Sequence, residues 1–180
     1  ASVGLARRME RLGADGVIAE GCESGGHVGE TTTMVLVPQV ADAVNIPAIA
    51  AGGIASGRQM VAAEVLGACG VQVGTCLLST TECPIHENYK QAVRNARDTH
   101  ITVMGRIAGT PVRVIKNDMV REYIAREKEG ATLMELEHYT LGSLRRAVKE
   151  GDIETGSVMA GQTAAMIHDE CSLAERIETL

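Results

Sequence analysis

The fold is decided by Pro47-Ala48-Ile49-Ala50-Ala51-Gly52-Gly53 and, one amphipathic segment later, Val71-Gln72-Val73-Gly74-Thr75. The first begins with a short apolar run, Ala48-Ile49-Ala50-Ala51, and the second with Val71-Gln72-Val73, and each run has the length and composition of a short strand. Each run ends in glycine, where a backbone can turn sharply or approach a ligand. Between them, Ser56 is placed to cap a helix from Gly57 to Leu66. The stretch predicts a strand–helix–strand unit.

The same unit extends toward the N-terminus. Gly16-Val17-Ile18-Ala19 is another apolar run, and residues 34–44 have a helical pattern. Because proline is tolerated only near the first turn of a helix, we expect the regular part of that helix to begin at Val37. Residues 3–12 predict a surface helix capped by Ser2. Parallel strands alternating with helices are typical of a doubly wound sheet or a (β/α)₈ barrel, and this rhythm alone does not separate the two.

The second half of the chain has a different pattern. Residues 101–115 are mixed and punctuated by glycine and proline, so no regular order is expected there. Helices are predicted over residues 84–96, 118–128, 133–149 and 157–167, and from residue 173 to the end. We therefore divide the chain into a barrel part, residues 1–80, and a mainly helical appendage, residues 81–180.

Composition excludes several classes of protein. The 180 residues carry a net charge of −6, which argues against a broad nucleic-acid-binding surface. No run of 18 apolar residues is present to span a membrane. The 5 cysteines are odd in number and contain no Cys-x-x-Cys pair, which favours reduced thiols in a cytoplasm. The first residue is Ala1 and not Met, so we expect the chain to begin within a longer protein.

The three predicted strands all end in residues that favour a ligand site. They are followed by Glu20-Gly21, Gly52-Gly53 and Gly74-Thr75. The carboxyl ends of parallel strands share one edge, where α/β proteins bind ligands. Glycine lets backbone N–H groups approach an anion, and the N-terminus of the next helix adds partial positive charge. The two glycine turns therefore predict a phosphate site, with ordinary tight turns as the alternative.

A histidine stands in the glycine-rich loop after the first strand, in the run Ser24-Gly25-Gly26-His27. An imidazole at this edge could donate or accept a proton near neutral pH, whereas the alternative is a loop histidine that bonds backbone. The other histidines have no Cys or carboxylate in metal-ligand register, so no metal site is expected. Cys22 and Cys76 lie at the same edge, where small packing residues are favoured over a thiolate nucleophile. Glu20 and Glu23 are placed to orient the imidazole or to bond a ribityl or ribose hydroxyl.

These motifs together resemble a known family. Three segments resemble, in order, spacing and identity, the nitronate monooxygenase family of FMN-dependent barrels: residues 20–29, 50–54 and 71–75. Within that family, Thr31-Thr32-Thr33-Met34 and residues 113–117 and 156–162 resemble the flavin-dependent enoyl-acyl carrier protein reductase II branch. The likeness runs from Ser2 to about Ala164.

The resemblance implies a (β/α)₈ TIM barrel that carries FMN, of which this chain holds the last three strands and a helical C-terminal appendage. It implies that His27 is the catalytic residue, and that Ser157 and Gln162 meet the substrate on a segment that closes near the flavin. No metal is implied. The cofactor-binding residues implied by the loops and by the resemblance are Glu20, Gly26, Ala51, Gly52, Gly53, Gln72, Gly74, Thr75 and Met159.

The implied reaction is reduction of trans-2-enoyl thioesters on acyl carrier protein, in type II fatty acid synthesis, by NADH or NADPH through FMN. One alternative is a nitronate monooxygenase that uses FMN and O₂. The other is an inactive fragment or a non-catalytic flavin-binding module, because three strands cannot close a barrel of eight. No nucleic acid or membrane partner is expected, and a homodimer is compatible with the resemblance. Cys76 and Leu77 depart from the family, whose members often have Arg and an aromatic residue there.

Overall fold

The chain contains two three-stranded sheets, and the first is parallel. The computed structural model describes residues 2–180. The strands of the first sheet are β1 (Val17–Glu20), β3 (Ala48–Ala51) and β4 (Gly70–Gln72), in the order β1-β3-β4. The helices that alternate with them are α1 (Val3–Arg11), α2 (Thr33–Ala41) and α3 (Gly57–Val65). The predicted alternation of parallel strands and helices is confirmed.

Small and branched aliphatic side chains fill the core between this sheet and its helices. Val37 of α2 and Ala50 of β3 have no exposed surface. Such side chains let helix and strand approach closely. They can therefore fill the core without Phe or Trp. The predicted cap of α1 is confirmed, because the Ser2 hydroxyl accepts a hydrogen bond from the Leu5 N–H at 3.2 Å. The core residues include Ala19, Leu36, Val37, Val40, Ala48, Ala50, Ile54 and Ala63.

α2 begins earlier than its sequence pattern predicts. It starts at Thr33, not near Val37, and holds Pro38 in its interior. The Glu23 carboxylate accepts hydrogen bonds from the Thr33 N–H at 2.9 and 3.1 Å and so satisfies the first turn. The local prediction was wrong because this partner stands 10 residues earlier in the chain.

The second sheet was not predicted. It is antiparallel and consists of β2 (Gly26–His27), β5 (Ile101–Met104) and β6 (Val112–Ile115), in the order β2-β6-β5. The glycines that made residues 101–115 look irregular belong to the turn between β5 and β6, which is closed by a hydrogen bond from the Thr110 N–H to the Gly105 carbonyl. β2 lies in residues 1–80 and β6 in residues 81–180, so this sheet joins the two parts of the chain.

Helices are present in the predicted segments 84–96, 118–128 and 173–180, but the helix predicted over residues 133–149 is broken. Gly142 adopts a left-handed conformation with φ of +74° and ends the regular helix. The helices of the second half are α4 (Glu87–Arg94), α5 (Asp118–Lys128), α6 (Leu133–Thr140), α7 (Ser143–Arg145) and α8 (Leu173–Glu178). Shorter turns are η1 (Thr75–Leu77), η2 (Asp98–His100), η3 (Arg146–Glu150) and η4 (Gln162–Met166).

The helix predicted over residues 157–167 is wrong. Its first residues are extended, and only the 3₁₀ turn η4 follows. The backbone of this segment pairs with β6 instead: the Ile115 N–H donates to the Val158 carbonyl at 2.8 Å, and Met159 forms a β-bridge with Val114. Pairing with a distant strand has replaced the local helix.

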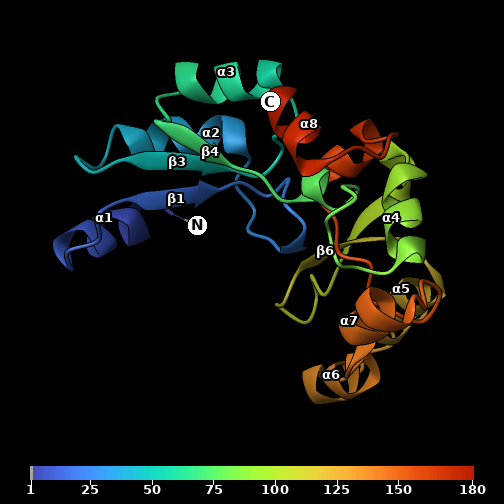
Figure 1. Cartoon of the computed structure of the whole chain (residues 1–180). Coiled ribbons are helices and arrows are strands. Elements are labelled where there is room, and N and C mark those ends of the chain that lie inside the picture. The colour runs from blue at the N-terminus through green and yellow to red at the C-terminus, as the bar shows by residue number, and fades with distance from the viewer. Residues whose placement is uncertain (1) are drawn as a thin grey trace.

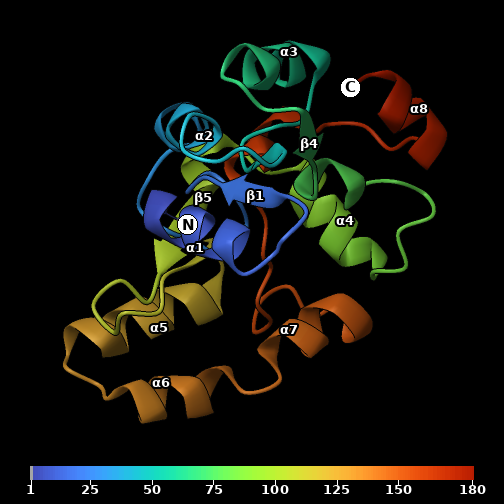
Figure 2. The same ribbon diagram turned by 90° about the vertical axis from the view of Figure 1, so that its left-hand side faces the viewer.

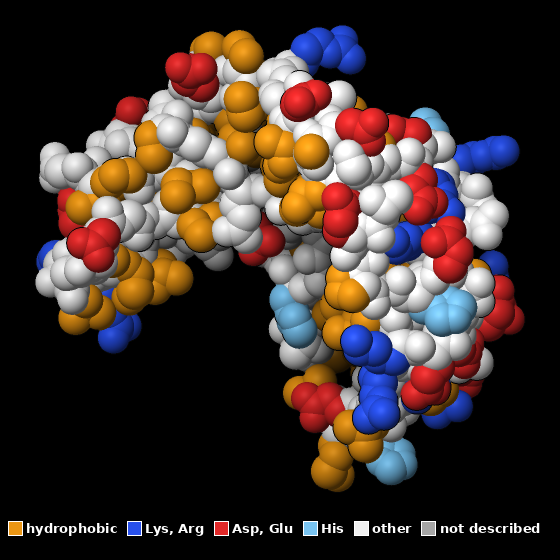
Figure 3. Space-filling view, in the orientation of Figure 1, with side chains coloured by type: hydrophobic (Ala, Val, Ile, Leu, Met, Phe, Trp, Pro, Cys, Tyr) orange, Lys and Arg blue, Asp and Glu red, His pale blue; other side chains and the backbone are white. Residues whose placement is uncertain are grey.

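The two sheets lie toward opposite ends of the molecule. Figure 1 shows the parallel sheet with α1, α2 and α3 at one end, and β6 with α4 to α7 at the other. Figure 2 shows α5, α6 and α7 gathered opposite α3 and α8. α8 returns to the parallel sheet, where the Gly57 N–H donates to the Thr179 carbonyl at 3.3 Å. The surface is hollowed between the two ends (Figure 3). Leu5 of α1, Leu12 directly after α1 and Ile18 of β1 are at least half exposed.

Candidate functional site

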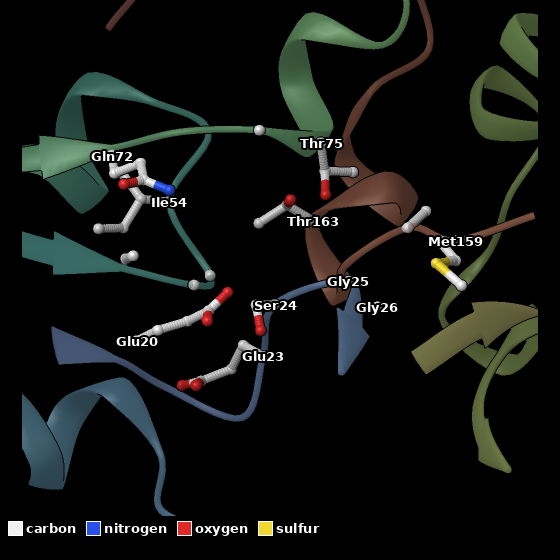
Figure 4. Close-up of a pocket in the computed structure, with 15 residues that line it drawn as sticks. Glu20, Glu23, Ser24, Gly25, Gly26, Ile54, Gln72, Thr75, Met159 and Thr163 are labelled. Atoms are coloured by element: carbon white, nitrogen blue, oxygen red, sulfur yellow. The ribbon is translucent and has the colours of Figure 1, made fainter. Parts of the chain in front are cut away.

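A pocket lies where the three parallel strands end, and we call it the rim pocket. Its volume is about 250 Å³. Glu20, Ala51 and Gln72, the last residues of the three strands, stand side by side in the register of the sheet. All nine residues predicted to bind the cofactor line this pocket (Figure 4): Glu20, Gly26, Ala51, Gly52, Gly53, Gln72, Gly74, Thr75 and Met159. Six further residues complete the lining: Glu23, Ser24, Gly25, Ile54, Ala160 and Thr163.

Two glycines of the rim pocket have different roles. Gly52 has φ of +87°, and a Cβ added there would lie 2.7 Å from the Gly21 carbonyl oxygen. Glycine is therefore required at this position by the fold of the loops. A Cβ added at Gly74 would meet no atom within 4 Å. The space beside the Gly74 backbone is open to a ligand.

Backbone donors line the rim pocket without partners of their own. Within residues 2–180, the N–H groups of Gly53, Gly74 and Thr75 make no hydrogen bond. The Thr75 hydroxyl accepts a hydrogen bond from the Gly161 N–H at 2.9 Å, so its own proton stays free to donate. No Lys or Arg is among the lining residues in the described chain. This donor set suits an anion that is bound by backbone groups.

The two carboxylates of the rim pocket face different ways. In Figure 4 the Glu20 carboxylate points into the pocket, whereas that of Glu23 points away from it. Glu23 is occupied by Thr33, which donates from its N–H and from its hydroxyl at 2.9 Å each. Glu20 can accept hydrogen bonds from hydroxyl groups of a ligand. Free backbone donors together with one carboxylate acceptor fit FMN, whose side chain is a polyol that ends in a phosphate.

The segment 157–162, expected to close near the flavin and the substrate, forms a fixed wall of the rim pocket. The Tyr89 hydroxyl donates to the Met159 carbonyl at 2.6 Å, and the Gln162 N–H donates to the Glu23 carbonyl at 2.9 Å. A Cβ added at Gly25 would lie 2.6 Å from the Ala160 carbonyl carbon, so the wall packs directly on the glycine-rich loop. Burial raises the pKa of Tyr89 far above its usual value. The phenol therefore remains a donor to the wall.

A second pocket lies on the other side of this wall, and we call it the histidine pocket. Its volume is about 280 Å³, and its lining includes His27, Tyr123, Glu137, Ser143, Ser157 and Met159. Met159 lines both pockets. Successive residues of a strand point to opposite faces, which explains why Gly26 lines the rim pocket and His27 lines the histidine pocket. β2 and Met159 thus separate the two pockets.

The structure separates the predicted catalytic and substrate residues from one another. His27 and Ser157 share the histidine pocket, and neither lines the rim pocket. The Gln162 side chain is exposed and lines neither of these pockets. The roles of His27, Ser157 and Gln162 remain predictions.

The cysteines at the rim are poorly placed for nucleophilic chemistry. Cys76 is completely buried, and burial raises the pKa of its thiol. Burial, followed by the nearby Glu23 carboxylate, also raises the pKa of Cys22. A raised pKa disfavours the reactive thiolate. Both thiols are consistent with the packing role expected from sequence.

Sequence reasoning missed several residues that position the site. The Arg113 guanidinium is buried and donates from Nε and Nη2 to the Cys22 carbonyl at 3.2 and 2.7 Å, which fixes the loop before His27. Burial lowers the pKa of this arginine. Ser143 was hidden inside a predicted continuous helix, although the preceding Gly142 could have signalled a break. Tyr89 carried no local signal, because its partner Met159 is distant in sequence.

Two features of the described residues bear on the kind of site. Within residues 2–180, no group of three or more His, Cys, Asp and Glu side chains could hold a metal ion. Over the same residues, no helix has both the length and the apolar character that crossing a bilayer requires.

Parallel strands whose carboxyl ends line a pocket of free backbone donors are typical of α/β enzymes that bind a phosphate-bearing ligand. Comparison with known proteins agrees with this class. The sequence model of the family described as nitronate monooxygenase matches residues 1–180. The chain belongs to this family, which consists of FMN-dependent oxidoreductases.

Individual relatives cover the chain almost fully. A probable nitronate monooxygenase of Staphylococcus saprophyticus is 36% identical over an alignment of 177 residues that covers 92% of this chain and 50% of that protein. The structure of FabK from Thermotoga maritima matches with a TM-score of 0.95 and 49% identity, over 99% of this chain and 57% of that one. A nitroalkane oxidase from Streptomyces ansochromogenes matches with a TM-score of 0.83 and 31% identity, over 99% of this chain and 54% of that one. The chain spans about half the length of these relatives, and its fold is part of a (β/α)₈ barrel.

Proposed function

We propose that the chain is part of a flavin-dependent enoyl-acyl carrier protein reductase of type II fatty acid synthesis. The observation that carries this proposal is the contact of two pockets across Met159, one with backbone donors and one with an imidazole. Two of the segments that resemble the reductase II branch lie at these pockets. Residues 113–117 include most of β6, and residues 156–162 include the shared wall. Identity is 49% with FabK and 31% with the nitroalkane oxidase, so the similarity does not single out the nitroalkane-oxidising relative.

The rim pocket would hold the phosphate and the ribityl chain of the cofactor. When bound, FMN supplies the hydride that reduces the enoyl double bond, after reduction by NADH or NADPH. The N–H groups of Gly53, Gly74 and Thr75 would bind the phosphate, and the Glu20 carboxylate would accept hydrogen bonds from the ribityl hydroxyls. The task of these residues is to bind and orient, because the hydride chemistry belongs to the cofactor.

The histidine pocket would hold the trans-2-enoyl thioester. Hydride addition at the β-carbon leaves negative charge on the α-carbon and the thioester oxygen. His27 would deliver a proton to the α-carbon, and the Ser157 hydroxyl would donate a hydrogen bond to the thioester oxygen. Both groups line the side of the wall that faces away from the phosphate donors.

The proposal includes the partners and the division of the chain. Residues 1–80 form the barrel part, and residues 81–180 form an appendage that supplies the wall and most of the histidine pocket. The substrate is carried by acyl carrier protein, and a homodimer is compatible with the proposal. The five cysteines are free thiols in the structure, which supports a cytoplasmic setting. Neither nucleic acid nor membrane is expected as a partner.

Nitronate monooxygenase activity is the second candidate. The name of the family and of the staphylococcal relative favours it. In that reaction His27 would abstract the α-proton, and O₂ would be the oxidant. The third candidate is a non-catalytic fragment, which is favoured by the position of β1 and β4 at the open edges of the parallel sheet.

Substrate-dependent turnover of the flavin-loaded enzyme tests these candidates. We expect NADH or NADPH to be consumed when a crotonyl thioester of acyl carrier protein is added. Oxygen uptake with a nitronate, and no nucleotide consumption that depends on the enoyl thioester, would replace the reductase by the monooxygenase. Purified protein that is colourless and binds no FMN would favour the third candidate.

A further inference from the structure

The histidine pocket contains a pair of buried hydroxyls. Ser143 is 4% exposed and Ser157 is 2% exposed, and their Oγ atoms lie 2.7 Å apart. The two residues are also joined through the backbone, because the Ser157 N–H donates to the Ser143 carbonyl at 3.0 Å. Both residues line the pocket beside His27. The pair is therefore rigid and adjacent to the candidate acid.

One of the two hydroxyl protons of the pair has no hydrogen-bond acceptor within residues 2–180. Two hydroxyls carry two protons, and the bond between them uses one. Neither hydroxyl makes another hydrogen bond within residues 2–180. A buried donor without an acceptor is costly, so the second proton calls for an acceptor in the pocket.

The Thr140 hydroxyl of the same pocket does not share this property, because it donates back to the Leu136 carbonyl at 3.1 Å. The Ser143–Ser157 pair differs from the Tyr123 and Thr110 hydroxyls of the pocket because both of its members are buried and their Oγ atoms are hydrogen-bonded to each other. A hydroxyl that also accepts a hydrogen bond is a stronger donor, because chained hydrogen bonds polarise one another.

We propose that Ser143 donates to the Ser157 oxygen and thereby aims the Ser157 proton at the carbonyl oxygen of an α,β-unsaturated thioester in the histidine pocket. This inference rests on the proposed function. Ser157 touches the substrate, whereas Ser143 is a positioning residue that acts through Ser157. Ser157 takes the substrate-facing role because it lies on the same wall segment as Met159, the residue common to both pockets.

The pair acts at the step where charge develops. When a hydride adds to the β-carbon, the electron pair of the carbon–carbon double bond moves onto the α-carbon and the thioester oxygen. The Ser157 O–H donates a hydrogen bond to that oxygen and keeps its proton. A proton from His27 then forms the new bond at the α-carbon, and the carbonyl is restored. The donor is useful because it is already oriented before the charge appears.

Two measurements on the holoenzyme test the proposal. The first is the infrared stretch of an isotope-labelled thioester carbonyl bound to the oxidised enzyme without reductant. The second is the rate constant for enoyl reduction in a single turnover. We expect Ser157→Ala to lose the hydrogen-bond shift of the carbonyl stretch and to slow reduction about 10²–10³-fold.

Ser143 variants isolate the positioning role. Ser143→Ala should weaken the same carbonyl shift, lower kcat more than it raises KM, and slow reduction by roughly tenfold, a fraction of the loss of a direct donor. Ser143→Thr retains the hydroxyl and should restore both readouts. Thr132→Ala is the matched control, because it removes a hydroxyl that caps α6 outside the pocket and should leave both readouts unchanged.

The outcomes separate this inference from the proposed function. If the enzyme reduces enoyl thioesters while Ser143→Ala keeps the carbonyl stretch and the rate of the wild type, the positioning role is wrong and the proposed function stands. If Ser143→Thr behaves like Ser143→Ala, a packing role replaces the hydrogen bond. An enzyme that reduces no enoyl thioester overturns both.

Discussion

The two pockets that meet at Met159 are built from different parts of the polypeptide. The rim pocket offers backbone N–H groups of Gly53, Gly74 and Thr75, and its shape depends on positions where no side chain fits. The histidine pocket instead offers side chains from β2, α6, α7 and the wall segment. Backbone donors suit a phosphate that is the same in every FMN molecule, whereas side chains can adapt to a particular substrate. Substitutions in the rim pocket should therefore lower cofactor retention, whereas substitutions in the histidine pocket should lower turnover.

The largest effect should come from the imidazole. His27→Ala should slow enoyl reduction about 10²–10⁴-fold, the usual contribution of a positioned acid or base. Flavin content should remain that of the wild type, because His27 lines only the histidine pocket of the two. The measurements are steady-state turnover and flavin absorbance per mole of protein. An undiminished rate, or loss of flavin in proportion to the rate, would contradict the separation of the two pockets.

The opposite result is expected for Gly74→Val. The new side chain would enter the open space beside the Gly74 backbone, where no protein atom lies within 4 Å. We expect the dissociation constant of FMN to rise at least about tenfold, equivalent to 1.4 kcal/mol of binding free energy. Flavin fluorescence titration measures the affinity, and circular dichroism confirms the fold.

Gly70→Val is the matched control for this change. Gly70 is the first residue of β4, the strand that leads to Gly74. A Cβ added at Gly70 would also meet open space, but Gly70 does not line the rim pocket. Gly52→Val would be a poor test, because its side chain would strain a positive φ and meet the Gly21 carbonyl, which lowers stability directly. Equal flavin affinity in the Gly74 and Gly70 variants would contradict the prediction that the phosphate binds at the Gly74 turn.

Tyr89→Phe should disturb both pockets, because it acts on the wall between them. The substitution removes the donor to the Met159 carbonyl and leaves a buried acceptor unpaired. We expect the free energy of unfolding to fall by about 1–3 kcal/mol. Denaturant unfolding followed by circular dichroism measures the change. Unfolding at the denaturant concentration of the wild type would mean that the wall does not depend on this bond.

The smallest effect should come from an ion pair that lines neither pocket. The Arg176 guanidinium donates to the Asp169 carboxylate at 2.9 Å and lowers the pKa of that carboxyl. A lowered folded-state pKa adds stability above the unfolded pKa of about 3.9, and this stability is lost as the pH falls through the folded pKa. Because the Asp169 side chain is 62% exposed, the gain is at most about 1 kcal/mol.

Acid unfolding of the wild type and of Asp169→Asn checks this last expectation. The two proteins should differ in stability at neutral pH and converge as the pH falls through the lowered folded-state pKa of Asp169, where the wild-type carboxyl also loses its charge. Flavin content and turnover should be unchanged in the variant at neutral pH. A difference that persists undiminished in acid would assign the effect to packing and not to charge.

The parallel half of the molecule could be predicted because its signals are local. Apolar runs, glycine turns and capping residues follow one another within a few positions, and the shared edge of parallel strands then brings Glu20, Ala51 and Gln72 together. The second sheet could not be predicted in this way. β2 is only two residues long, and its partner β6 lies in the other half of the chain, so no local periodicity marks the pairing.

The sequence by itself predicted the parallel strands and the glycine turns, because buried strands and tight turns impose residue types on their own positions. Together with the family resemblance, it indicated nine of the fifteen residues that line the rim pocket. Only the tertiary structure decided that His27 faces a second pocket, that Ser143 meets Ser157 there, and that residues 157–161 form a wall and not a helix. These features depend on hydrogen bonds between segments far apart in the chain. Backbone N–H and C=O groups that would otherwise form the hydrogen bonds of a local helix are bonded to these distant segments instead.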